Sequence, residues 1–145
     1  MDLEFFIHVS LAGLLATYLH LVGALWADRY GLPRIDLPRG MTQITFGDSF
    51  DGPAPYGWGI AVIHVNGIAF ALLYATVIAQ YLPGEPYIKG LIFGGILYLG
   101  AMLIFVPFFL KDGFFGSKGH PMGWLTALII HLIYGLIVGW LSPIL

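Results

Sequence analysis

Residues 119–145, GHPMGWLTALIIHLIYGLIVGWLSPIL, contain no Asp, Glu, Lys or Arg, and this stretch indicates the class of the fold. Residues 5–27, 53–83 and 90–110 share that property. Each stretch holds about 20 predominantly apolar residues, the length that a helix needs to cross ~30 Å of hydrocarbon. Barrel strands are not indicated, because apolar and polar residues do not alternate. The sequence therefore predicts one transmembrane domain over residues 1–145, an all-α integral membrane four-helix bundle with helices at about 5–27, 57–82, 88–110 and 122–143.

The composition agrees with a chain whose surroundings are largely lipid. Of its 145 residues, 59% are hydrophobic and 10% are charged, and the mean hydropathy is +0.87. A soluble domain carries about 25% charged residues, so this chain could not cover its surface with polar groups. The absence of cysteine excludes thiol catalysis, and the net charge of −2 gives no reason to expect a nucleic-acid partner.

The connections between the predicted spans differ in character. Residues 28–56 form a long proline-rich first loop, with four prolines, four glycines, three arginines and four aspartates. We expect a short extended or interfacial stretch on the headgroups at 31–39, and such a loop is often functional or docks a partner. A solvated connector is the alternative. PGEP at 83–86 predicts a tight turn, so the second and third helices should form an antiparallel hairpin.

The distribution of basic residues predicts an orientation. The first and third loops hold five of them, whereas the opposite side holds only Lys89; the five are Arg29, Arg34, Arg39, Lys111 and Lys118. By the positive-inside rule, these loops lie in the cytoplasm and both termini lie outside.

Small residues recur on each predicted span at helical spacing, and they mark the faces where helices approach closely in lipid. These residues are Gly13, Ala16 and Gly23; Gly67, Ala71 and Ala75; Gly90 and Gly94; and Ala127, Gly135 and Gly139. His20, His64 and His131 fall on the same faces. Each lies eight to ten residues from the basic-loop end of its span, which places it ~10–15 Å inside that face of the membrane.

An ionisable group inside a membrane is costly and therefore suggests a function. The first hypothesis is a haem b with His64 and His131 as its axial ligands, or contact with a quinone. The second is a metal ion bound by His20, His64 and His131, without a carboxylate in the spans to assist. The third is structural, with neutral imidazoles forming hydrogen bonds between helices. The sequence leaves all three open.

Short motifs along most of the chain resemble a family of small four-span bacterial inner-membrane proteins of uncharacterised function. The motifs are GLLAT at 13–17, GLPRID at 31–36, HVNGI at 64–68, LYA at 73–75, GLIFG at 90–94, Pro107, GFF at 113–115 and HLIYGL at 131–136. The resemblance implies the four-helix fold and a bacterial cytoplasmic membrane. It implies no activity.

Several functions are disfavoured by the residues themselves. The span cores hold no carboxylate for an ion-coupled transporter, and the sequence has no phosphate loop, metalloprotease motif or nucleophile elbow. We therefore expect no catalytic residues and no catalytic activity of its own. The sequence predicts a non-catalytic accessory or assembly subunit of a larger membrane complex, respiratory or otherwise redox, with lipid and other membrane subunits as partners. The alternative is a small haem-b electron-transfer protein.

Overall fold

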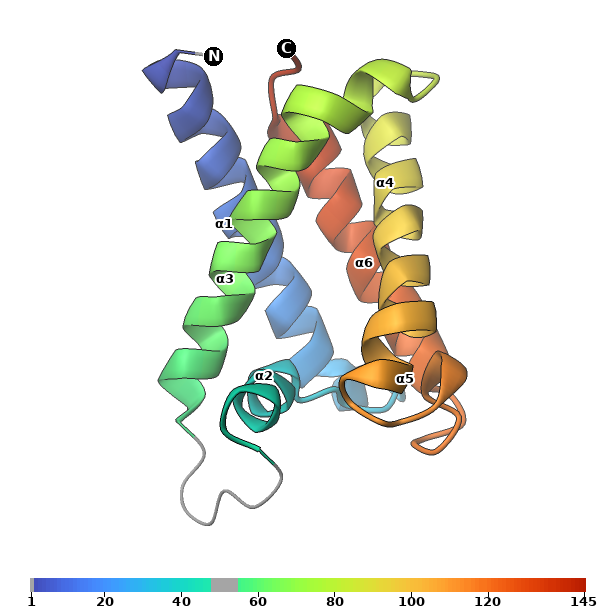
Figure 1. Ribbon diagram of the computed structural model, residues 1–145. Helices are drawn as coiled ribbons and strands as arrows, with labels where there is room; N and C mark the ends of the chain where they lie inside the picture. Colours follow the sequence, from blue (N-terminus) through green and yellow to red (C-terminus); the bar gives the residue numbers. More distant parts are fainter. Residues whose placement is uncertain (1, 48–54) are drawn as a thin grey trace.

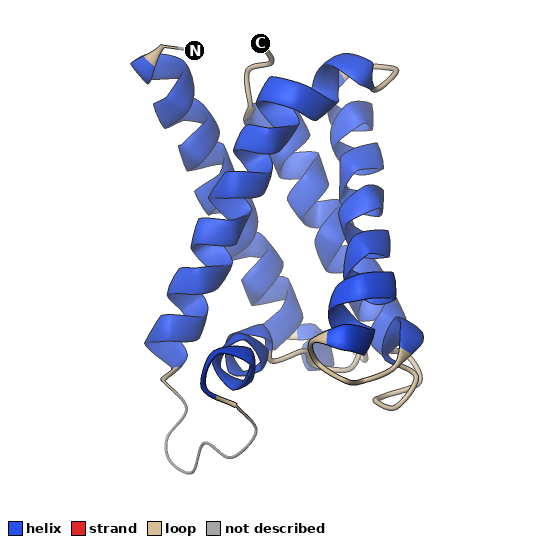
Figure 2. Cartoon of the chain, in the orientation of Figure 1, coloured by secondary structure: helices blue, strands red, loops and turns tan. Residues whose placement is uncertain are grey.

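The computed structural model describes residues 2–47 and 55–145, and in this part of the chain all regular structure is helical (Figures 1 and 2). In the described residues, four helices are long and apolar enough to cross a membrane. The first span is α1 (Leu3–Leu25) and the fourth is α6 (Gly123–Leu141). The second span (Tyr56–Tyr81) begins as α3 (Tyr56–Leu73), and the third span (Pro86–Phe108) begins as α4 (Pro86–Gly100). The predicted all-α membrane fold is therefore confirmed. The hydrocarbon thickness sets the length of a span, so counting uncharged residues located the four helices well.

The first loop contains a helix that the sequence analysis missed. After a 3₁₀ turn (Ala27–Tyr30), the chain forms α2 (Leu37–Phe46), so an extended conformation is wrong for that part of the loop. The Asp36 side chain caps this helix by accepting a hydrogen bond from the backbone N–H of Arg39 at 3.2 Å. Pro38 lies in the first turn, where a proline has no helical hydrogen bond to lose. Residues 48–54 of the predicted loop lie outside the described residues.

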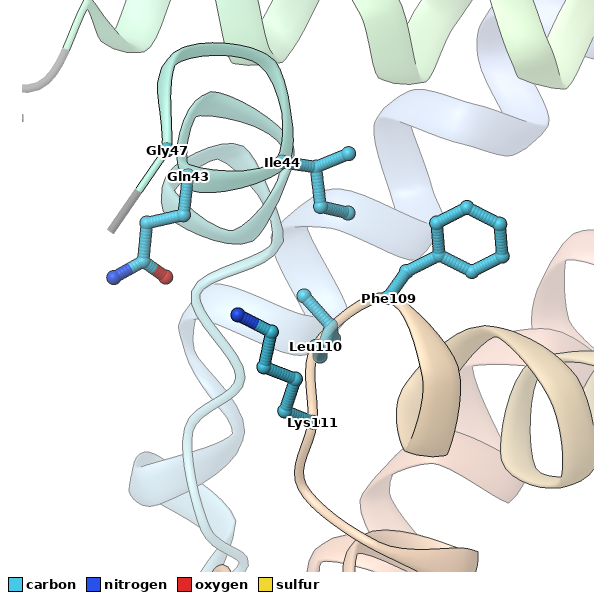
Figure 3. A pocket seen from close by; sticks show the side chains of 6 residues that line it. All are labelled: Gln43, Ile44, Gly47, Phe109, Leu110 and Lys111. Atoms are coloured by element: carbon cyan, nitrogen blue, oxygen red, sulfur yellow. The ribbon is translucent and has the colours of Figure 1, made fainter. Parts of the chain in front are cut away.

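Helix α2 lies across the end of the bundle. Figure 1 shows the spans from the side and α2 nearly along its own axis. It packs against α3, where a Cβ at Gly59 would overlap the carbonyl oxygen of Pro38. On its other side it faces the segment that follows the third span, where a Cβ at Gly40 would lie 3.3 Å from Leu110 (Figure 3). Helix α2 therefore bridges the ends of the second and third spans.

The four spans pack in the order α3, α1, α6, α4. Where α1 packs against α3, a Cβ on Gly13 would lie only 2.8 Å from the Cβ of Ala71. At the contact between α4 and α6, Gly90 and Gly135 face each other so closely that a Cβ on either would overlap the backbone oxygen of the other. The small-residue faces predicted from the sequence therefore do form helix contacts, as expected for association in lipid.

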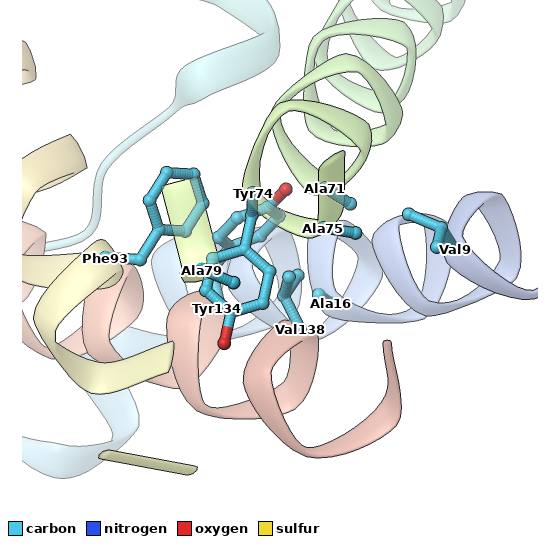
Figure 4. Close-up of a cluster of buried hydrophobic side chains, with 9 residues drawn as sticks. All are labelled: Val9, Ala16, Ala71, Tyr74, Ala75, Ala79, Phe93, Tyr134 and Val138. Atoms are coloured by element: carbon cyan, nitrogen blue, oxygen red, sulfur yellow. The ribbon is translucent and has the colours of Figure 1, made fainter. Parts of the chain in front are cut away.

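The second and third spans meet only near the turn that joins them. The predicted hairpin is present, but α4 touches the second span mainly at its last turns, and α3 and α4 then diverge toward the loop end (Figure 1). Near the turn, the rings of Tyr74 and Phe93 lie 5.1 Å apart. They belong to a core cluster that fills this half of the bundle (Figure 4): Val9, Ala16, Ala71, Tyr74, Ala75, Ala79, Phe93, Tyr134 and Val138. In the half that carries the basic loops, the described residues form a smaller core cluster between the third span and α6, namely Tyr98, Met102, Val106 and Ala127.

Both diverging spans contain a π-helical segment, Tyr74–Ile78 in the second and Ala101–Phe105 in the third. Pro107 closely follows the segment in the third span, and a proline cannot donate the backbone hydrogen bond that an α-helix would need there. In the segment of the second span, the hydroxyl of Thr76 donates to the carbonyl of Leu72 at 2.7 Å. Such a hydrogen bond often bends a helix. The backbone N–H of Leu145 donates to Ala75 O at 3.1 Å, which ties the C-terminus to this segment.

Candidate functional site

A cavity of about 660 Å³ occupies the loop half of the bundle, in the space left by the divergence of α3 and α4. Its volume lies in the range of small-molecule binding sites. Helices α1 and α6 form its floor, and the second and third spans form its walls. The lining is predominantly apolar, and its polar side chains are Thr17, His20, Asn66, Asp112, His120, His131 and Tyr134.

The surroundings of the cavity differ on each side. The packed ring pair of Tyr74 and Phe93 lies toward the hairpin, and Leu37 and Met41 of α2 contribute to the lining at the loop end. Between α3 and α4, the lining residues Phe70, Ile96 and Ile104 are 42%, 46% and 58% exposed. Because these side chains lie within the spans, the exposed rim faces the hydrocarbon of the membrane. The cavity therefore opens sideways into the lipid.

The floor of the cavity brings two intramembrane histidines together. The rings of His20 on α1 and His131 on α6 lie 5.1 Å apart, with their planes at 83°. The ring of Tyr134, one helical turn after His131, lies 6.2 Å from that of His20. Tyr98 of α4 approaches His131 from the other side, with ring centroids 6.1 Å apart. The close packing of α1 and α6 is what makes these contacts possible.

Backbone hydrogen bonds define which atoms of the floor can meet a ligand. His131 Nδ1 lies 2.7 Å from the carbonyl oxygen of Ala127. A carbonyl oxygen can only accept, so Nδ1 carries the proton and Nε2 of the neutral ring is an acceptor. The hydroxyl of Tyr134 donates to Gly67 O on α3 at 2.5 Å, and its oxygen can still accept. The floor therefore offers acceptors from His131 and Tyr134, whereas the imidazole of His20 offers one donor and one acceptor in its neutral form.

His64 lies elsewhere on α3, outside the lining of this cavity. Its Nδ1 lies 2.8 Å from Ile60 O, so in the neutral ring its Nε2 is also an acceptor. Of the two residues predicted as haem ligands, only His131 lines the cavity, and its histidine neighbour is His20. Within the described ranges, no group of three or more His, Cys, Asp or Glu side chains could hold a metal ion. The ligand roles of His20, His64 and His131 stay predictions.

Asn66 is a further polar residue of the site, on α3. It lines the cavity, and among the described residues its side chain makes no hydrogen bond. An amide in the middle of an uncharged span was the signal. Asp112 and His120 come from the third loop and also line the cavity. Their contribution had no sequence signal, because it depends on how the loop folds back over the bundle.

A second, smaller pocket of about 260 Å³ lies between α2 and the segment after the third span. Figure 3 shows its six lining side chains, with Lys111 extending toward the last turn of α2; they are Gln43, Ile44, Gly47, Phe109, Leu110 and Lys111. A cation is favourable near the C-terminal end of a helix. We interpret this pocket as part of the contact that holds α2 in place.

The fold and the cavity together define a four-span integral membrane protein with a ligand-sized site inside its spans. The chain belongs to the family of unknown function DUF6789, which it matches over residues 6–145. No curated protein and no solved structure matches it.

Proposed function

We propose that this protein is a non-catalytic accessory subunit of a larger redox complex in the bacterial inner membrane, and that it holds a lipid-soluble ligand between its spans. One observation carries the proposal: an apolar cavity of about 660 Å³ opens sideways between α3 and α4, and His20 and His131 lie at its floor.

The cavity is suited to an amphipathic ligand. Its walls are apolar and its rim lies within the spans, so a ligand can arrive from the hydrocarbon of the membrane. Its floor offers hydrogen-bonding groups, and such groups are costly inside a membrane unless they find a partner. A molecule with a polar end and an apolar body satisfies both parts of the cavity. These features are those of a recognition site, with few well-placed polar groups in an apolar surface.

The cellular setting is part of the same proposal. The resemblance to small bacterial inner-membrane proteins favours that membrane, and the arginines and lysines of the first and third loops favour a cytoplasmic position for these loops. Both termini would then lie outside, and the cavity would lie in the cytoplasmic half of the bilayer. The lack of catalytic motifs in this sequence favours an accessory role over an enzymatic one.

Haem b remains the alternative cofactor, with His64 and His131 as its axial ligands; it would extend beyond this cavity, because His64 lies outside the lining. One observation favours it: both imidazoles have Nδ1 hydrogen-bonded to the carbonyl four residues earlier, which leaves Nε2 available to an iron atom. The visible spectrum of the purified protein decides this alternative. A Soret band that disappears in His64→Ala and in His131→Ala supports it, and a protein without a Soret band eliminates it.

Two glycines of α4 provide a matched test of ligand binding. Gly100 lines the cavity and a Cβ there would meet no atom within 4 Å, so Gly100→Phe should fill the cavity without a clash. Gly95 has the same open surroundings but does not line the cavity, so Gly95→Phe is the control. The protein is isolated with its surrounding lipid in a styrene–maleic acid copolymer, and its apolar compounds are extracted and analysed by mass spectrometry.

We expect one amphipathic compound to be enriched in the wild type and in Gly95→Phe and to be lost in Gly100→Phe. The same bulk lipids in all three samples would argue against a binding function. The accessory role is tested separately by gentle solubilisation and cross-linking. A chain that always purifies alone would contradict that part of the proposal.

A further inference from the structure

We infer that the ligand of this cavity is a neutral ring compound with carbonyl acceptors and an apolar tail, the quinone class. Its ring would lie at the floor beside His20 and His131, and its tail would leave between α3 and α4. This inference rests on the proposed binding function and specifies the ligand.

The charges around the cavity favour a neutral head group. Among its described lining residues there is no Lys or Arg, and the one charged side chain is the carboxylate of Asp112. Proteins bind phosphates and carboxylates mainly through Arg, Lys and backbone N–H groups. The described part of the lining offers no Lys or Arg to the phosphate of a phospholipid or the propionates of a haem. The carboxylate of Asp112, an exposed residue of the third loop, adds a negative charge to the lining.

The hydrogen-bonding groups favour a carbonyl compound over a plain hydrocarbon. The Asn66 amide has two N–H donors and no hydrogen-bond partner among the described residues, so an acyl chain beside it would leave these donors unpaired. We assign the contact with a quinone carbonyl to the Asn66 amide, and His20 offers a second N–H donor. In the reduced form, a ring hydroxyl can instead donate to Nε2 of His131, which is an acceptor because Nδ1 is bonded to the backbone. The same cavity can therefore bind both the oxidised and the reduced form of the quinone ring.

The shape of the cavity is consistent with a planar head group. The rings of His20, His131 and Tyr134 meet edge to face at the floor, an arrangement that suits further aromatic contact. Gly100 keeps one wall open, since a Cβ there would point into empty space. The exposed rim between Phe70 and Ile104 provides an apolar path for a tail that reaches into the bilayer.

The test uses the full-length protein in nanodiscs and an azido-quinone photoprobe, with mass spectrometry to locate the labelled residues. We expect labelling of the rim residues of the second and third spans, competed by ubiquinone-1 but not by phosphatidylglycerol. Gly100→Phe should lower the labelling at least tenfold, whereas Gly95→Phe should not. Should Gly100→Phe fail to give a folded protein by circular dichroism, Gly100→Leu provides a smaller filling residue at the same site.

Asn66→Leu tests the polar contact directly. It should weaken competition by ubiquinone-1 about tenfold, since one hydrogen bond to the ligand is lost. Its control is Val65→Leu on the adjacent lipid-facing position, where the side chain is 66% exposed and no effect is expected. Unchanged competition in Asn66→Leu would overturn the assigned contact.

The outcomes separate this inference from the proposed function. If the cavity instead retains a phospholipid or a haem that Gly100→Phe excludes, the quinone class is wrong and the binding function stands. If no compound distinguishes Gly100→Phe from Gly95→Phe, both fail.

Discussion

Two adjacent glycines of α4 provide the sharpest test of how the bundle is packed. A Cβ on Gly94 would overlap the carbonyl oxygen of His131 and lie 3.3 Å from Cα of Gly135, whereas a Cβ on Gly95 would meet nothing within 4 Å. The atoms around Gly94 belong to the backbone of α6 and cannot move without moving the helix. We therefore predict that Gly94→Ala destabilises the protein and that Gly95→Ala does not.

The expected magnitude follows from comparing the two variants. Each Gly→Ala substitution gains up to about 1 kcal/mol of helix propensity, a contribution that cancels in the difference. The remaining term is overpacking, which costs about 1–3 kcal/mol. The free energy of unfolding of Gly94→Ala should therefore be lower than that of Gly95→Ala by this amount, a change of about 5- to 150-fold in the equilibrium constant.

Reversible unfolding in mixed micelles, with the mole fraction of sodium dodecyl sulfate as the denaturant scale, measures this difference by far-UV circular dichroism. Gly135→Ala extends the test to the other helix, since its Cβ would lie 2.7 Å from Cα of Gly94. It should resemble Gly94→Ala. Equal stability of Gly94→Ala and Gly95→Ala would refute the close backbone contact between α4 and α6.

Two further predictions concern the loops. Asp36→Ala removes the N-cap of α2, which accepts from Arg39 N, and also the hydrogen bond that the hydroxyl of Tyr56 donates to Asp36. Loss of the cap alone should cost about 0.5–2 kcal/mol, and hydrogen exchange of α2 should accelerate. Arg34→Ala removes only an exposed ion pair of 3.8 Å and should leave that exchange nearly unchanged, so an equal effect of both would contradict the capping role. Because the chain has no native cysteine, single substitutions can report its orientation. In intact cells an impermeant maleimide should label Glu85→Cys and reach Ser117→Cys only after permeabilisation, and the reverse pattern would invert the proposed topology.

The sequence predicts a common depth for the three histidines but does not predict which of them are neighbours. Counting residues from the span ends placed His20, His64 and His131 in the same half of the membrane, because the helical rise per residue is constant. Which of them meet depends on the packing order and rotation of the helices. Since α1 packs directly against α6, His20 lies beside His131, and His64 lies outside the cavity that both of them line.

Helix α2 was missed for a different reason. The proline-rich first loop predicts an extended or interfacial stretch at 31–39, but Pro38 lies where a helix tolerates proline and Asp36 provides its cap. This short helix is polar enough to lack the long apolar run that identified the spans. Its packing against α3 and its position beside Leu110 come from contacts between distant parts of the chain.

The sequence alone determined the four spans and the faces on which they pack, because hydrocarbon thickness and the need for close approach in lipid act on local patterns of residues. Only the tertiary structure decided that the second and third spans diverge after their turn. Their divergence follows from α3 packing on α1 and α4 packing on α6, two contacts between segments far apart in the chain. The cavity with His20, Asn66 and His131 exists because these contacts leave the fourth side of the bundle open.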